Sequence, residues 1–174
     1  MGRKPTISRE TLLAIAEDIV NADGPHALTI DALAKAAGIS KGGVQYSFAS
    51  KDTLIKALID RWTAQFDALV LDVETADPID FVRSYIAAMR SSQGMLDAKA
   101  AGLMITYMQN PANRVETAQW YRSILGRLGN SREARVARTA FLAMEGLMLI
   151  RMFGVEDNNE WQALLNEIEY VLEM

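Results

Sequence analysis

The chain has 174 residues, half of them apolar, and a net charge of −4. It contains no cysteine, which excludes disulfides, thiolate catalysis and cysteine-bound metals. No apolar run approaches the roughly 18 residues that a membrane-spanning helix needs, and no apolar segment follows the two basic residues at the N-terminus as it would in a signal peptide. We therefore expect a soluble cytoplasmic protein that needs no cofactor.

The first half of the sequence predicts four helices, each with apolar residues at steps of three and four. The first begins after Ser8 and ends at Gly24. A second helix is capped by Thr29 and ends at Gly38, and Ser40 then opens a short third helix. Ser50 caps a long fourth helix, and the apolar pattern predicts that this helix continues to about Glu74.

The second half predicts further helices over residues 78–90, 95–109, 111–128 and 132–153, and a last one capped by Asp157 with Glu160. No period-two strand pattern is present. The expected fold is therefore all-α, with about nine helices. We divide the chain into an N-terminal domain at residues 1–60 and a C-terminal helical domain at residues 61–174, without a flexible linker between them.

Residues 29–54 have the spacing of a helix-turn-helix, which places one short helix in the DNA major groove. Ala34 is small enough for close helix crossing, Gly38 suits the turn, and Val44 packs the second helix. The alternative interpretation is a helical hairpin that has no DNA-binding function and shows the same spacing by chance. Acidic and basic side chains balance in residues 1–60, so the net charge of −4 lies in the remainder and does not oppose DNA binding here.

The same region resembles the TetR/AcrR family of transcriptional regulators. The resemblance rests on Thr29-Ile30, Leu33-Ala34, Ala37-Gly38-Ile39-Ser40, Gly42, Phe48 and Lys51. It implies a three-helix DNA-binding domain followed by a bundle that binds a small-molecule effector and forms a homodimer through its last two helices. The apolar stripes and small residues of residues 132–153 and of the last helix independently favour such a dimer, with a monomeric core as the alternative.

The predicted DNA-contacting residues lie at helix starts, on the short third helix and in the N-terminal arm: Thr29, Ser40, Lys41, Gly42, Gly43, Gln45, Tyr46, Ser47, Lys51, Arg3 and Lys4. Thr29 and Lys51 resemble the family's phosphate-contacting threonine and lysine. Gln45 departs from the family's usual tyrosine and is the first candidate for base recognition, since glutamine pairs with adenine, and Lys41 is the second. Alternatively, Gln45 contacts only phosphate or water, and Arg3 and Lys4 form a solvated tail.

Flexible methionines and aromatic residues in the middle of the bundle predict an adaptable effector pocket: Met89, Met104, Tyr107, Met108, Trp120, Tyr121, Met144 and Met148. The alternative is a solid core in which methionine fills gaps. Glu145 lies within an apolar run. It either recognises a cationic ligand or pairs with Arg138, Arg151 or a residue of a partner chain.

An enzyme is not expected, because the sequence has one histidine and no catalytic or metal-binding motif. The main alternative is a helical adaptor that binds protein and not DNA. The spacing of residues 29–54 favours a DNA-binding regulator. The family resemblance implies a repressor that binds a palindromic operator as a homodimer and is released by its effector. Activation in place of repression stays open.

Overall fold

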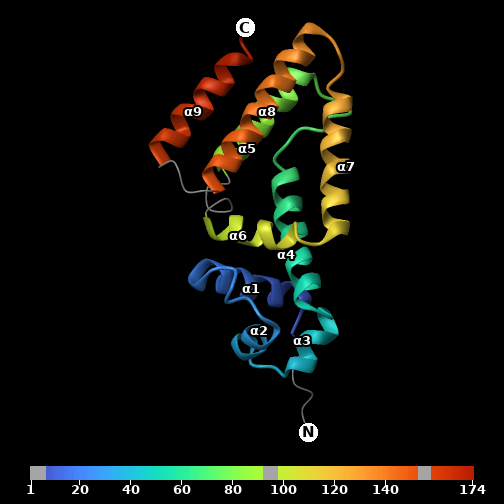
Figure 1. The fold of residues 1–174 in the computed structure, drawn as a ribbon, viewed down its shortest axis with the longest axis vertical. Coiled ribbons are helices and arrows are strands. Elements are labelled where there is room, and N and C mark those ends of the chain that lie inside the picture. Colours follow the sequence, from blue (N-terminus) through green and yellow to red (C-terminus); the bar gives the residue numbers. More distant parts are fainter. Residues whose placement is uncertain (1–6, 92–97, 153–157) are drawn as a thin grey trace.

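The computed structural model describes residues 7–91, 98–152 and 158–174. These residues form nine α-helices and no strand, which confirms the all-α fold (Figure 1). The helices are α1 (Arg9–Asp23), α2 (Ile30–Ala37), α3 (Lys41–Ser47), α4 (Lys51–Asp67), α5 (Pro78–Ser91), α6 (Ala98–Tyr107), α7 (Pro111–Arg127), α8 (Arg132–Met152) and α9 (Asn158–Val171). The arm residues Arg3 and Lys4 and the expected cap Asp157 lie outside the described residues.

Side-chain caps fix where the first four helices begin. Ser8, Thr29, Ser40 and Ser50 each accept a hydrogen bond from a backbone N–H of the first turn that follows. Each cap satisfies a donor that the helix itself leaves without a partner. These starts agree with the sequence-based prediction because capping depends on only a few adjacent residues.

The predicted extension of the fourth helix to Glu74 is wrong, because α4 ends at Asp67. The side chain of Asp72 accepts a hydrogen bond from the Glu74 N–H at 2.9 Å, and the Leu71 N–H donates to Ser84 Oγ at 2.9 Å. Such side-chain bonds compete with the helical pattern. The residues after α4 therefore form turns that lead to α5.

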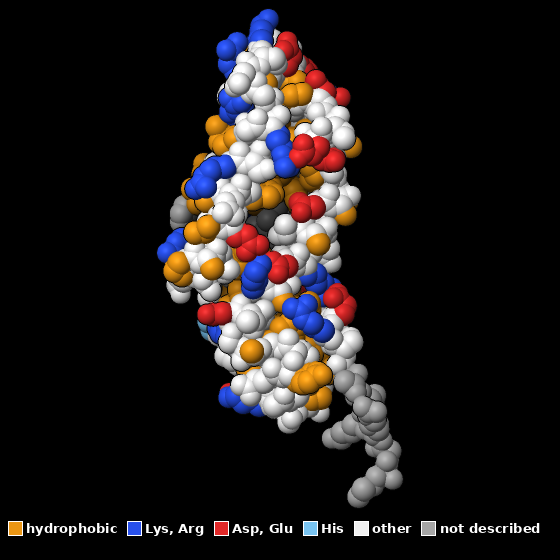
Figure 2. All heavy atoms as spheres, turned by 90° about the vertical axis from the view of Figure 1, so that its right-hand side faces the viewer, with side chains coloured by type: hydrophobic (Ala, Val, Ile, Leu, Met, Phe, Trp, Pro, Cys, Tyr) orange, Lys and Arg blue, Asp and Glu red, His pale blue; other side chains and the backbone are white. Residues whose placement is uncertain are grey.

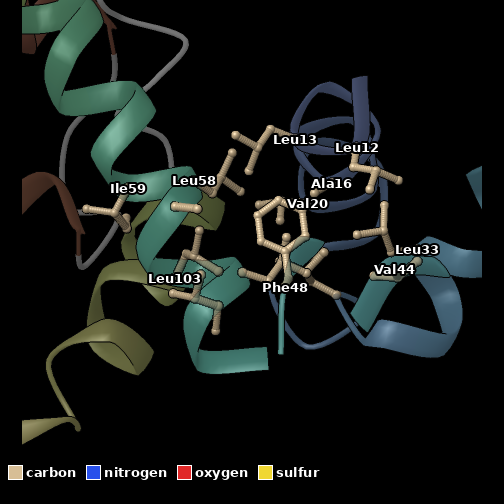
Figure 3. Close-up of a cluster of buried hydrophobic side chains, with 14 of the residues drawn as sticks. Leu12, Leu13, Ala16, Val20, Leu33, Val44, Phe48, Leu58, Ile59 and Leu103 are labelled. Atoms are coloured by element: carbon tan, nitrogen blue, oxygen red, sulfur yellow. The ribbon is translucent and has the colours of Figure 1, made fainter. Parts of the chain in front are cut away.

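The helices surround two hydrophobic cores at opposite ends of the molecule (Figure 1). The first core is formed by α1 to α4 together with Leu103 and Tyr107 of α6, with Phe48 at its centre (Figure 3). The second core joins α5, α7, α8 and α9 and includes the fully buried Trp161 and Phe141. Helix α6 contributes to the first core and also contacts α8, so it joins the two ends of the molecule.

None of the described helices is both long and apolar enough to cross a bilayer.

Candidate nucleic-acid interface

Helices α2 and α3 form a tight pair whose buried contacts match the predicted helix-turn-helix. Leu33 and Val44 are fully buried, and Ala34 is 6% exposed. Gly38, at the turn, has φ 65° and ψ 28°, in the left-handed region where a side chain is strained. The pair therefore holds α3 in one orientation at the end of the molecule (Figure 1).

One face of α3 projects into solvent. Lys41, Gln45 and Tyr46 are exposed, and Tyr46 retains 92% of its accessible surface. A Cβ atom at Gly42 would meet nothing closer than Ser40 Oγ at 3.9 Å, so packing within the chain does not require glycine there. At Gly43, by contrast, a Cβ would lie 3.3 Å from Ile39 Cδ1. Gly42 thus leaves the backbone open to a partner, while Gly43 also serves internal packing.

Lys41 has an internal partner that the sequence analysis did not identify. Its Nζ lies 3.0 Å from Asp31 Oδ2 on α2, and both side chains are more than half exposed. An exposed ion pair of this kind contributes little stability. A DNA phosphate can therefore replace Asp31 at a small cost in free energy. Lys41 remains a candidate DNA contact.

The remaining predicted DNA contacts flank α3. Thr29 and Ser40 are exposed, and both use their side-chain oxygen as a helix cap. Lys51 is the first residue of α4 and is half-buried, as is Ser47 at the end of α3. The predicted residues within the described chain thus lie on α3 itself or at the starts of α2, α3 and α4.

The sequence indicates only some of the contacts that hold this surface in place. Phe48 is 1% exposed, and the Arg9 guanidinium lies 4.9 Å from the centre of its ring. Farther along α4, Trp62 Nε1 donates to Glu17 Oε1 at 2.9 Å and joins α4 to α1. These contacts between distant parts of the sequence join α1 to Phe48, which follows α3, and to α4.

The predicted effector-pocket residues divide between the two cores. Met104, Tyr107 and Met108 pack in or against the first core. The others, Met89, Trp120, Tyr121, Met144 and Met148, lie in or against the second core. A cavity of about 340 Å³ lies at the junction of α4, α6 and α7, and its lining includes Asp52, Tyr107 and Asn113.

Glu145 is held by two tyrosines of the second core. The hydroxyl of Tyr85 donates to its Oε1 at 2.7 Å, and the hydroxyl of Tyr121 donates to its Oε2. Arg138, an expected partner, donates instead to the backbone carbonyls of Leu125 and Gly129. Burial and the nearby Glu145 charge raise the pKa of both tyrosines well above 10.0, so both phenols stay protonated as donors.

An exposed helix-turn-helix on an all-α bundle defines a class of helical DNA-binding regulators. Comparison with protein families agrees with this class. Residues 12–58 match the bacterial regulatory proteins of the tetR family, and residues 80–173 match the tetracyclin repressor-like C-terminal domain. The chain belongs to the TetR family and is a DNA-binding transcriptional regulator; members of this family are not enzymes.

Solved structures of low sequence identity share the fold over nearly the whole chain. A transcriptional regulator from Rhodococcus sp. Rha1 is 20% identical with a TM-score of 0.64, covering 97% of this chain and 95% of that one. A TetR variant from Acinetobacter baumannii AYE in complex with minocycline is 18% identical with a TM-score of 0.62, covering 96% and 95%. The flavonoid-responsive regulator FrrA is 21% identical with a TM-score of 0.54, covering 95% and 93%. No curated protein sequence matches the chain significantly.

Proposed function

We propose that the protein is a repressor that binds a palindromic operator as a homodimer and is released by a small-molecule effector. The observation that carries the proposal is the exposed face of α3, where Gln45 and Tyr46 stand beside the bare backbone of Gly42. One such helix covers few base pairs. Two copies, spaced by about 34 Å, cover two successive major-groove segments on one side of the duplex.

In this proposal Gln45 reads a base and its neighbours hold the backbone. Glutamine can form two hydrogen bonds with adenine in the major groove. Tyr46, Lys41 and Lys51 supply a hydroxyl and two positive charges for phosphates. Arg3 and Lys4 are proposed to reach an adjacent phosphate or groove.

The proposed dimer forms through α8 and α9. On α8 the exposed Leu142, Leu149 and Ile150 recur with small residues at steps that keep them on one side of the helix. On α9, Leu164 and Tyr170 are exposed as well. A second copy of the chain would bury these apolar surfaces, which a monomer leaves in water.

Two helices connect the proposed effector region with the DNA end. Helix α4 begins at Lys51 beside α3 and ends near Phe66, which packs against the second core. Helix α6 makes close backbone contacts with α1, α4 and α8. A ligand that binds differently in two arrangements of these helices changes the separation of the two α3 helices, and with it the DNA affinity.

The DNA proposal is tested by selecting duplexes from fragmented genomic DNA with the full-length protein and measuring affinity at several salt concentrations. We expect a palindromic site and a steep loss of affinity with salt. The Gln45→Ala variant should lose discrimination at one position of each half-site, by about 1–3 kcal/mol. If Gln45→Ala weakened binding equally for all operator variants, Gln45 would not read a base. If the protein bound no duplex, a protein-binding adaptor would be favoured.

The dimer is tested separately by sedimentation of Leu149→Asp, because a carboxylate on the proposed interface should give monomers. The matched control is Val115→Asp on α7, where the replaced side chain is 57% exposed. If Leu149→Asp remains dimeric, the interface lies elsewhere.

A further inference from the structure

The end of the molecule that carries the helix-turn-helix has few positive charges. Residues 29–52, which comprise α2, α3 and the start of α4, contain three lysines, no arginine and two acidic residues. Lys35 and Lys41 are exposed, and Lys51 is half-buried. On the face drawn in Figure 2, the lower end of the molecule, where Figure 1 places α2 and α3, shows mostly uncharged surface. The pairing of a single lysine therefore matters for the attraction to DNA.

One of the two exposed lysines is paired with a carboxylate of the neighbouring helix. Lys41 is the first residue of α3, and its Nζ lies 3.0 Å from Asp31 Oδ2 in the first turn of α2. Lys35 follows Asp31 by four residues, a spacing at which ion pairs form along a helix. The described residues nevertheless contain no ion pair between Asp31 and Lys35. The close packing of α2 and α3 directs Asp31 across the turn to Lys41.

The pair of Lys41 and Asp31 presents little net charge to DNA. The two side chains keep 56% and 72% of their accessible surface, so both are open to an approaching strand. A phosphate that approaches Lys41 also approaches Asp31, and at distances longer than that of the pair the attraction and the repulsion largely cancel. Only a phosphate held within hydrogen-bond distance of Lys41 gains by replacing Asp31.

We propose that Asp31 is a specificity-determining residue, which withholds Lys41 from non-operator DNA and yields it on the operator. This inference rests on the proposed function, since it requires a preferred site that seats α3 in the major groove. Non-operator DNA is bound through its backbone charge alone, with no phosphate at a fixed position, so Lys41 stays with Asp31. On the operator, the base contacts of α3 fix a phosphate beside Lys41, and the weak exposed pair is exchanged.

This exchange has a signature in the dependence of affinity on salt. Each phosphate that a lysine neutralises releases counterions and adds about one unit to the slope of log affinity against log salt concentration. Asp31→Asn keeps the size of the side chain and frees Lys41. It should steepen the slope for non-operator DNA by about one unit and tighten that binding about fivefold at physiological salt. Operator affinity should rise by at most about twofold with an unchanged slope, because Lys41 already contacts a phosphate there.

The test measures DNA binding by the full-length protein with fluorescence anisotropy at several potassium chloride concentrations. Two labelled duplexes are compared: the operator selected from genomic DNA, and a non-operator duplex with the same bases in scrambled order. The matched control is Asp52→Asn. Asp52 is exposed, lies two residues after the cap of α4 as Asp31 does after the cap of α2, and has no ion pair in the described part of the chain. Its replacement removes the same charge without freeing a lysine, so both slopes should stay as in the wild-type protein.

Three results would overturn the proposal. Weaker operator binding by Asp31→Asn would show that Asp31 orients Lys41 for DNA and does not withhold it. Equal tightening on both duplexes with unchanged slopes would show only a general effect of charge. A steeper slope on the scrambled duplex when Asp31→Asn is added to Lys41→Gln would show that Asp31 acts without Lys41.

The stability of these variants is checked by urea denaturation. Because an exposed ion pair contributes little, Asp31→Asn and Lys41→Gln should unfold close to the wild-type midpoint. Operator binding together with an unchanged slope on the scrambled duplex sinks only this inference. A protein that prefers no duplex contradicts the proposed function as well.

Discussion

The two cores of this protein are built differently. The first surrounds Phe48 with aliphatic side chains (Figure 3) from helices whose starts are capped. Its polar links lie at the edge, as between Trp62 and Glu17. The second contains a carboxylate, Glu145, held by two tyrosines among aromatic rings, with α7 packed loosely over it. The first core fixes the position of α3 through apolar packing, while the second core retains polar groups that stability alone does not require.

The largest effect on the free energy of unfolding is expected for a substitution at the centre of the first core. Phe48→Ala removes a ring that is 1% exposed and its contact with Arg9, and it should lower the free energy of unfolding by about 3–5 kcal/mol. Chemical denaturation measures the loss. The control is Tyr46→Ala, two residues earlier and 92% exposed, which should leave stability nearly unchanged and weaken DNA binding. Equal stability losses for both would contradict the packing of α3.

Glu145, Tyr85 and Tyr121 form a polar cluster in the second core. The effects of substitutions within this cluster on the free energy of unfolding should not be additive. Glu145→Leu alone leaves the Tyr85 and Tyr121 hydroxyls without their acceptor and should cost about 2–3 kcal/mol of unfolding free energy. Adding Tyr85→Phe and Tyr121→Phe removes the unsatisfied donors and should restore most of that loss. Denaturation of the single and triple variants measures both. A triple variant as unstable as Glu145→Leu would show that the cluster stabilises the fold by itself.

The junction between the two cores should be sensitive to a single methyl group. A Cβ at Gly102 of α6 would lie 2.6 Å from Pro25 Cγ, in the loop between α1 and α2. Gly102→Ala should therefore force the two elements apart, lower the unfolding free energy by about 1–2 kcal/mol and change operator affinity.

Gly126 on α7 is the control for this substitution, because a Cβ there meets nothing within 4 Å. Gly126→Ala should leave DNA affinity unchanged and stabilise the helix by up to about 1 kcal/mol. If Gly102→Ala behaves like Gly126→Ala in both measurements, α6 does not press against the DNA-binding end.

The smallest predicted effect is a pH dependence. Burial and Glu145 raise the pKa of Tyr85 and Tyr121 above 10.0 in the folded protein, so the unfolded chain loses these protons first. The unfolding free energy should then fall as pH rises above about 9. The double variant Tyr85→Phe, Tyr121→Phe should show a fall that is about 1 kcal/mol smaller by pH 10. The exposed Tyr170→Phe is the control, and equal slopes for all three proteins would contradict the buried cluster.

The sequence predicted best those features that depend on adjacent residues. The caps at Thr29, Ser40 and Ser50 and the turn at Gly38 were predicted at their observed positions, because each depends on a few bonds within the same segment. The end of α4 was predicted wrongly, since the apolar pattern continues past Asp67 while the Asp72 side chain and Ser84 redirect the backbone.

Partners from distant segments could not be predicted in the same way. Asp31 lies ten residues from Lys41, and Tyr85 lies sixty residues from Glu145, so only the packing of helices brings each pair together. Glu145 was nevertheless conspicuous as a charge inside an apolar run, and that signal identified the acceptor of the two tyrosine hydroxyls. The residues predicted to contact DNA remain predictions that the binding experiments test.

The most direct test of the account is the affinity of the wild-type protein and of Gln45→Ala for the selected operator and for variants of it, at constant ionic strength. For Gln45→Ala we predict a loss of discrimination of about 1–3 kcal/mol at one position of each half-site, with the other positions unchanged. Equal weakening on all operator variants would contradict the account.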